Sequence, residues 1–202
     1  AILLHSLATI RHIPFLRTRL NRTIAEPPPV SLRGWHTLIS HTWSTGQDQA
    51  RVLKERLQVM VPGLRIFLDV DDLDEAGGIG ELEAIVTKCS TLLVILSDGY
   101  FQSKNCLREL NAALDTDTPL VLVHERDPAR GGLSLERLRL QCPEALRERV
   151  FAYRVVEWQR IKPFQLVSLR LIGQGLLGEQ SLYIANELSE QPIDLPCMLY
   201  AS

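Results

Sequence analysis

Residues 91–110 read TLLVILSDGYFQSKNCLREL, and this stretch decides the fold class. Its first six residues form a continuous apolar run, which is typical of a strand buried on both faces of a sheet. Residues 100–114 follow with apolar side chains at helical spacing. A buried strand followed by such a helix predicts one βα unit of a parallel sheet.

The alternation of apolar runs and helical patterns continues on both sides of this stretch. Further strands are predicted at residues 36–40, 64–68, 119–123 and 150–156, and further helices at 46–60, 79–89, within 131–149 and at 163–177. Five strands alternating with five helices indicate right-handed βαβ units. The predicted fold is therefore α/β, with a five-stranded parallel sheet and helices on both faces.

The domain is predicted to occupy residues 32–178. Residues 1–31 are interpreted as a flank, with an amphipathic helix over residues 1–22 followed by a Pro-rich linker. Residues 179–202 show no clear period and are expected to be a tail or the start of a next segment. The chain begins at Ala1 without a methionine, so we expect it to be part of a larger multidomain protein.

Composition narrows the classes of partner. The chain has 202 residues, 46% of them hydrophobic, and a net charge of −2. This charge gives no overall attraction to nucleic acid. Residues 1–30 carry four arginines against Glu26 alone, a charge of +3, so the basic amino-terminal flank is the only segment for which membrane contact is considered. No run approaches the roughly 20 apolar residues of a membrane span.

The cysteines suggest a reducing environment. None of the four lies two residues from another or beside a cluster of histidines, which argues against a zinc site and a disulfide framework; they are Cys89, Cys106, Cys142 and Cys197. We therefore expect a cytoplasmic location.

An acidic stretch at residues 65–83, RIFLDVDDLDEAGGIGELE, raises two enzymatic alternatives. In a phosphatase of the haloacid-dehalogenase type, Asp69 would be the nucleophile and Asp71 the acid, around magnesium, with Ser97 from the next strand. In a receiver domain, Asp69 would accept phosphate. Both classes place their acidic pair after the first strand, whereas here the first strand ends in Ser40 and the acids follow the second.

Four elements together resemble a Toll/interleukin-receptor (TIR) domain over about residues 34–178. They are a first strand ending in Leu38-Ile39-Ser40-His41, a second ending in Leu68-Asp69 before a glycine-containing loop, a third ending in Leu96-Ser97, and a helix carrying residues 105–110, NCLREL. The resemblance implies the flavodoxin-like fold. It also identifies the acidic stretch as an assembly loop for contacts between TIR domains, with Asp71, Asp72, Asp74, Gly77 and Gly78, and implies a homo-oligomer.

The resemblance further implies one of two functions. Many TIR domains are adaptors that self-associate, and others cleave NAD at the nicotinamide–ribose bond. The enzymatic branch carries a glutamate on the third helix, and Glu109 matches that position. Cleavage of an N-glycosidic bond builds positive charge on the ribose, which one carboxylate can stabilise without a metal or cofactor. Glu109 lies at the edge of the predicted buried face of its helix, so it could face a cleft.

Other residues are predicted to bind NAD around Glu109. The loop of residues 41–46 would form the opposite wall, with His41, Thr42, Trp43 as a stacking surface, and Gly46 for close backbone approach. Asp69, Ser97 and Asn105 complete the predicted set. His41 could instead bond the local backbone, Trp43 could anchor the loop, and Asp69 could cap it.

One departure keeps the adaptor alternative open. The family often has a tryptophan four residues before the glutamate, where this chain has Asn105. A side chain without an aromatic ring there weakens the case for ligand stacking, so the sequence leaves an NAD hydrolase or cyclase and a non-catalytic adaptor as alternatives.

Overall fold

The computed structural model describes residues 13–32, 34–68, 82–178, 182–186 and 189–192. Within these residues, one parallel sheet has the strand order β3-β2-β4-β5-β6. Its strands are β2 (Trp35–Ser40), β3 (Ile66–Phe67), β4 (Cys89–Leu96), β5 (Leu120–His124) and β6 (Val155–Glu157). The first strand of the sheet thus lies between the second and the third, which is the flavodoxin-like order. The predicted fold class is confirmed.

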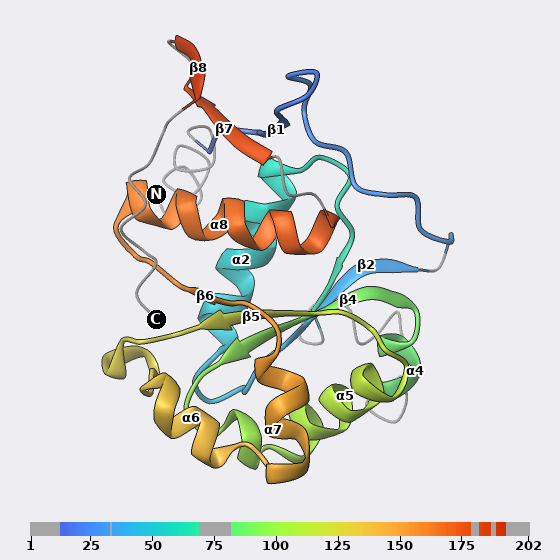
Figure 1. Cartoon of the computed structure of the whole chain (residues 1–202), viewed down its shortest axis with the longest axis vertical. Coiled ribbons are helices and arrows are strands. Elements are labelled where there is room, and N and C mark those ends of the chain that lie inside the picture. The colour runs from blue at the N-terminus through green and yellow to red at the C-terminus, as the bar shows by residue number, and fades with distance from the viewer. Residues whose placement is uncertain (1–12, 33, 69–81, 179–181, 187–188, 193–202) are drawn as a thin grey trace, which may run out of the picture.

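Helices cover both faces of the sheet (Figure 1). On one face lie α2 (Gln47–Met60) and α8 (Lys162–Leu177). On the other lie α4 (Leu82–Val86), α5 (Lys104–Asp115), α6 (Leu135–Gln141) and α7 (Glu144–Phe151). Two short 3-10 helices, η2 (Tyr100–Gln102) and η3 (Pro128–Arg130), lie in the connections after β4 and β5.

The position of β4 between two helical layers explains the run of apolar side chains at residues 92–96. Leu93 and Ile95 pack into the core cluster that includes α2 and α8. Leu92, Val94 and Leu96 pack into the second cluster, with α5 and α6. Because consecutive side chains of a strand point to opposite faces, a strand covered by helices on both sides needs apolar residues at every position.

Several predicted elements have different bounds in the structure. The helix predicted within residues 131–149 is two helices, since α6 ends at Gln141 and Pro143 is the residue that precedes α7. A proline cannot continue a helix because it lacks the backbone N–H. The strand predicted over 150–156 is shorter, because α7 runs to Phe151 and β6 begins at Val155.

The helix predicted over residues 100–114 begins later, as α5 at Lys104. Gly99 has φ +83°, a backbone conformation that suits glycine, and starts the short helix η2. Ser103 then caps α5, its Oγ accepting a hydrogen bond from the Cys106 N–H at 3.4 Å.

The predicted amphipathic helix over residues 1–22 is wrong where the structure describes it. Strand β1 (Leu16–Thr18) pairs antiparallel with β7 (Leu182–Asn186), with Leu16 opposite Ile184, and β7 pairs with β8 (Ser189–Pro192). This second, three-stranded sheet lies beyond α8, on the side away from the parallel sheet (Figure 1).

The small sheet is packed into the core beneath it. Leu16, Leu182 and Ile184 are buried in the same cluster as α2 and α8. Leu16 lies against Gly173 of α8 so closely that a Cβ atom on Gly173 would be 2.5 Å from Leu16 Cδ1. The described parts of the two flanks therefore contact each other and the helical layer directly.

Candidate active site

Three loops meet at the carboxyl ends of the parallel strands. The loop of residues 41–46 follows β2, and the Thr45 hydroxyl donates to the carbonyl of Asp98, after β4, at 3.1 Å. The Asp98 N–H donates to the Gly131 carbonyl, after β5, at 2.8 Å. In a doubly wound α/β sheet, ligands bind at this edge. The candidate site is therefore assembled from segments that are far apart in the sequence.

Glu109 projects from α5 toward this edge. Its neighbours Cys106, Leu110 and Ala113 belong to the core, and Glu109 is itself only 5% exposed. The carboxylate reaches the carboxyl end of β2, where Ser40 Oγ donates a hydrogen bond to Glu109 Oε2 at 2.5 Å. A buried carboxylate needs such a donor, because an isolated buried charge is very costly.

Two residues beside Glu109 were not assigned a role from the sequence. Ser40 and Tyr100 are both buried, and the Tyr100 hydroxyl lies 2.8 Å from Ser40 Oγ. Burial, and secondarily the neighbouring Cys106 and Glu109, raise the pKa of the Tyr100 phenol well above its usual value. The sequence signal was present in Ser40, a polar residue at the end of a buried strand.

Thr42 and Ser97, both predicted to bind NAD, are brought together. Ser97 Oγ lies 3.0 Å from Thr42 Oγ1 and 3.0 Å from Thr45 Oγ1, and the two threonine hydroxyls also bond to each other. Ser97 is fully buried and Thr42 is 6% exposed. Their hydroxyls fasten the loop of residues 41–46 to the end of β4.

His41 also holds this loop in place. It is buried, its Nδ1 lies 3.3 Å from the Ile39 carbonyl, and its own carbonyl accepts a hydrogen bond from the Cys106 thiol at 3.3 Å. The local backbone contact considered from the sequence is thus present. The thiol contact attaches the loop to α5, the helix that carries Glu109.

Trp43 and Gly46 occupy the exposed part and the base of the loop. The Trp43 side chain is 57% exposed, so its indole ring presents a surface to solvent. Gly46 immediately precedes α2, and its N–H donates to the Thr42 carbonyl at 2.8 Å. A Cβ atom on Gly46 would lie 3.0 Å from His41 Cβ and 3.1 Å from the Thr42 carbonyl oxygen, so glycine permits this tight turn.

The sequence comparison agrees with this architecture. The profile described as TIR domain matches residues 38–150, which is more than half of the chain. The chain belongs to the TIR domain family. The matched segment begins in β2 and ends in α7, and it includes Ser40, Tyr100 and Glu109.

Solved structures show the same fold at low identity. The TIR domain of the Toll-related receptor TRR-2 from Hydra magnipapillata has a TM-score of 0.51 and 13% identity, covering 70% of this chain and 98% of that one. A metazoan TIR-STING receptor from C. gigas, solved in complex with 2′,3′-cGAMP, also has a TM-score of 0.51 and 13% identity, covering 74% of this chain and 42% of the receptor chain. No curated protein matches this sequence.

Of the other site residues predicted in this TIR domain, the structure describes Asn105. Asn105 lies exposed in the first turn of α5, one turn before Glu109. The remaining ones lie outside the described residues; they are Asp69 and the assembly-loop residues Asp71, Asp72, Asp74, Gly77 and Gly78.

A second buried carboxylate at this edge was missed from the sequence. Glu125, 1% exposed, directly follows β5 and forms an ion pair with Arg160. Its Oε2 also accepts from Gln49 Nε2 at 3.2 Å, and its Oε1 from the Asp127 N–H at 2.8 Å. The acid at the end of the apolar run 119–123 was the available signal. The Glu125 side chain thus joins α2, the loop after β5 and the segment before α8.

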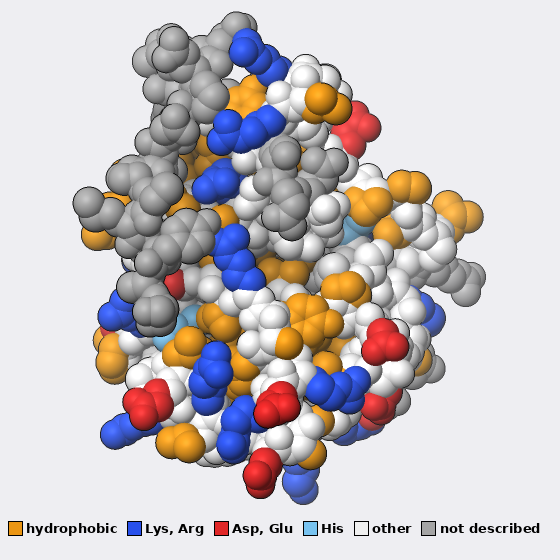
Figure 2. All heavy atoms as spheres, viewed as in Figure 1, with side chains coloured by type: hydrophobic (Ala, Val, Ile, Leu, Met, Phe, Trp, Pro, Cys, Tyr) orange, Lys and Arg blue, Asp and Glu red, His pale blue; other side chains and the backbone are white. Residues whose placement is uncertain are grey.

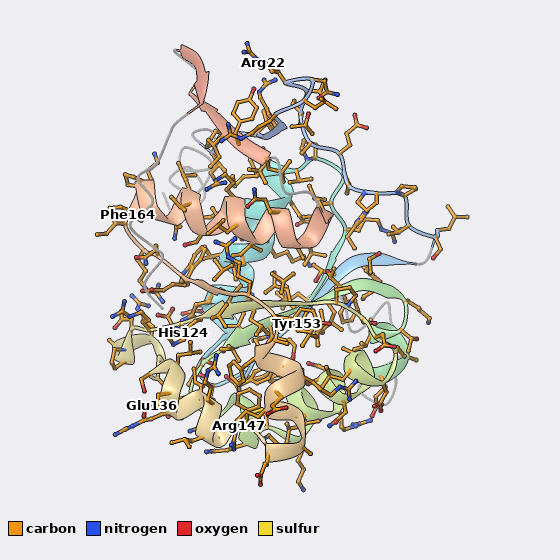
Figure 3. The ribbon with its side chains drawn as sticks, in the orientation of Figure 1. Arg22, His124, Glu136, Arg147, Tyr153 and Phe164 are labelled. Atoms are coloured by element: carbon orange, nitrogen blue, oxygen red, sulfur yellow. The ribbon has the colours of Figure 1, made fainter. Side chains whose placement is uncertain are left out.

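A cavity of about 310 Å³ lies away from this site. Its lining includes Thr118, two residues before β5 begins, and Tyr153, labelled in Figure 3. The other lining residues are Leu114, Asp117, Arg149 and Ala152. The cavity therefore lies at the amino ends of the strands, whereas the buried carboxylates gather at the carboxyl ends. We place the candidate site at the carboxyl ends because ligands of doubly wound sheets bind there.

Charges of both signs lie on one face of the molecule. On the face shown in Figure 2, Lys and Arg side chains are interspersed with Asp and Glu over the helical layer of α6 and α7. Among the described residues, no group of three or more His, Cys, Asp or Glu side chains is arranged to hold a metal ion.

In the part of the chain that the structure describes, no helix has the length and apolar character needed to cross a membrane.

Proposed function

We propose that this TIR domain cleaves NAD at the nicotinamide–ribose bond, with Glu109 as the catalytic residue. The observation that carries the proposal is the placement of a buried, hydrogen-bonded carboxylate at the carboxyl edge of the sheet, where Ser40 donates to Glu109 Oε2 at 2.5 Å. The predicted substrate is NAD itself, and no separate cofactor is proposed.

The chemistry requires little more than a held negative charge. When the bond between C1′ of the ribose and the nicotinamide nitrogen breaks, the electron pair goes to nicotinamide, which leaves neutral. Positive charge develops on the ribose, and a preorganised carboxylate stabilises it. Water then adds to C1′ and releases a proton, giving ADP-ribose, or a nitrogen of the adenine adds and gives a cyclic product.

The loop of residues 41–46 supplies the proposed binding wall. Its exposed Trp43 offers an aromatic face for a base, a role that position 105 does not fill because it is asparagine. Thr42, Ser97 and His41 contribute by fixing the loop, since their described contacts are with the loop, with β2 and with α5. Gly46 permits the tight turn that leads into the first turn of α2, because a Cβ atom there would lie 3.0 Å from His41 Cβ.

Release of nicotinamide from NAD tests the proposal. Glu109→Gln keeps the size of the side chain and removes its charge, so we expect less than a few per cent of the wild-type rate. Glu83→Gln is the matched control, because Glu83 is an exposed carboxylate on α4 paired with Arg108. Activity should persist in EDTA. A chelator-sensitive activity would instead support the hypothesis of a magnesium site at Asp69 and Asp71.

We propose in addition that the domain works as a homo-oligomer. The support is the acidic stretch 69–75 with its following glycines, which resembles the family's assembly loop. Clustered acids are unfavourable without cations nearby, and a basic surface on a second copy would supply them. Activity is then expected to rise more steeply than linearly with protein concentration.

A non-catalytic adaptor is the second candidate function. Two observations favour it: position 105 is asparagine rather than tryptophan, and Glu109 is 5% exposed with an internal hydrogen-bond donor. Under this alternative Glu109 only stabilises the fold. Wild-type protein that self-associates but releases no nicotinamide at high protein concentration would favour the adaptor.

A further inference from the structure

We infer that Ser40 and Tyr100 are positioning residues that orient the Glu109 carboxylate, a role that rests on the proposed function of that carboxylate. The two side chains come from different elements, the end of β2 and the short helix η2. They meet Glu109 of α5 at one point in the core, joined by hydrogen bonds of 2.5 and 2.8 Å.

The direction of the hydrogen bonds follows from the protons available. A serine hydroxyl has a single proton to donate. Ser40 gives its proton to Glu109 Oε2, so in the 2.8 Å contact with Tyr100 the phenol must be the donor. Burial holds the pKa of Tyr100 well above its usual value, so the phenol keeps this proton. The series of hydrogen bonds therefore runs from Tyr100 through Ser40 to Glu109.

Each hydrogen bond of this series strengthens the other. All three side chains are buried, with Ser40 1%, Tyr100 0% and Glu109 5% exposed. Hydrogen bonds in such surroundings are electrostatically stronger than in water, and consecutive ones polarise each other. The 2.5 Å distance between Ser40 and Glu109 lies in the range of an O–H···O⁻ bond to an ionised acceptor.

This arrangement serves the proposed reaction in two ways. A donor directed at a carboxylate favours its charged form, which is the form that stabilises a cationic ribose. The bond also fixes the side-chain conformation of Glu109 before substrate binds, so less ordering is required at the moment of reaction. Ser40 and Tyr100 act through Glu109 and need not touch NAD.

Other titratable groups lie on α5 or contact it. The thiol of Cys106 lies on the same helix and bonds to the backbone of His41, whose imidazole is buried after β2. Arg108, the next residue along α5, forms a bidentate ion pair with Glu83 of α4. None of these groups is changed in the variants chosen below, so their influence is the same in every protein compared.

Titration of the Glu109 carboxyl tests the inference without substrate. The 13C signal of its side-chain carboxyl is followed against pH in wild type, Ser40→Ala and Tyr100→Phe. We expect the midpoint to move to higher pH in Ser40→Ala, and by a smaller amount in Tyr100→Phe, because that change weakens the donor without removing it.

Thr91→Val is the control. It removes a buried hydroxyl that bonds to the His36 carbonyl at 2.9 Å, near the other end of β2. An unchanged Glu109 midpoint in both Ser40→Ala and Tyr100→Phe would overturn the inference, as would an equal shift in Thr91→Val.

Rates of nicotinamide release provide the second measurement. Ser40→Ala should lower kcat roughly tenfold with little change in KM, because it alters the catalytic group rather than NAD binding. Tyr100→Phe should have no further effect in the Ser40→Ala background, since its route to Glu109 is then absent. Additive losses of kcat in the double variant would overturn the inference that Tyr100 acts on Glu109 through Ser40. If the midpoints shift as expected but wild type releases no nicotinamide, the proposed function fails while the positioning role stands. If Ser40→Ala does not fold, Tyr100→Phe carries both measurements.

Discussion

The imidazole of His36 joins two segments of the chain at the edge of the parallel sheet. Its Nδ1 accepts a hydrogen bond from the backbone N–H of Arg65 at 2.8 Å, just before β3. A ring nitrogen that accepts carries no proton, so the proton of the neutral ring is on Nε2, which lies 2.9 Å from the Pro28 carbonyl and donates to it. His36 thus ties the Pro-rich stretch before β2 to the start of β3.

We predict that His36→Ala lowers the free energy of unfolding by about 1–3 kcal/mol, because a backbone donor and a backbone acceptor lose their buried partner. Denaturant unfolding measures the change. His36→Asn keeps an acceptor for the Arg65 N–H and His36→Gln keeps a donor for Pro28, so each should be less harmful than alanine. Three equally destabilised variants would show that volume, rather than hydrogen bonding, decides stability here.

The parts of the fold that were predictable depend on local pattern. Strand β4 could be recognised because burial on both faces favours apolar side chains at consecutive positions, as at residues 92–96. Strand β1 was mistaken for helix because its partner lies far along the chain, with Leu16 opposite Ile184. Three residues carry too little periodicity to reveal a pairing over such a separation.

The residues of the candidate site also divide into those that a local sequence pattern identified and those that only the folded structure brings together. Glu109 could be identified because it belongs to a short motif whose spacing is visible in the sequence. Its contact with Ser40 joins residues 69 apart, and the contact of Ser40 with Tyr100 joins residues 60 apart. Both contacts arise only when η2 and α5 are folded over the end of β2. Glu125 was missed because its partners come from other parts of the chain, Gln49 from α2 and Arg160 from the segment before α8.

The contact of Leu16 with Gly173 predicts that Gly173→Ala is destabilising in the wild type and stabilising once Leu16 is replaced by alanine. In wild type, Gly173→Ala places a Cβ 2.5 Å from Leu16 Cδ1 and should destabilise, by about 1–3 kcal/mol where overpacking dominates. Leu16→Ala alone should cost about 2–5 kcal/mol because it empties a buried site. In that background Gly173→Ala should become stabilising, because the new methyl group fills space and alanine favours helix.

Denaturant unfolding of these three variants, with the wild type, completes the cycle for Leu16 and Gly173. A Gly173→Ala effect of the same sign and size in both backgrounds would show that the small sheet does not press on α8 in solution. The far-ultraviolet circular dichroism of each variant checks that the helices are retained.

The buried thiol of Cys89 predicts a loss of stability at alkaline pH. Burial raises the pKa of Cys89 to about 12, above the usual range of about 8–9. Between these values the unfolded chain releases the proton and the folded chain keeps it. The unfolded state therefore binds fewer protons, and the free energy of unfolding falls as pH rises from about 9 toward about 12.

Unfolding measured from pH 8 to pH 11 in wild type and Cys89→Ala tests this dependence on Cys89. The substitution should make the fall with pH shallower, whatever its effect at pH 8. An unchanged slope would mean that the thiol contributes nothing to it. Cys142, whose pKa burial raises to about 11, remains in both proteins and cancels in the comparison.

The acidic stretch predicts how self-association responds to charge. Asp71→Asn, Asp72→Asn and Asp74→Asn together remove three negative charges from the segment that resembles an assembly loop. We expect weaker self-association with unchanged stability, seen by sedimentation across a dilution series. Added salt should have the same effect on wild type, since charges are screened beyond about 8–10 Å near physiological ionic strength. The control removes three charges from exposed positions elsewhere, with Asp115→Asn, Glu144→Gln and Glu148→Gln. Equal weakening in both triple variants would indicate that net charge, not this stretch, governs association, and a wild type that stays monomeric with constant specific activity would leave the stretch without an assembly role.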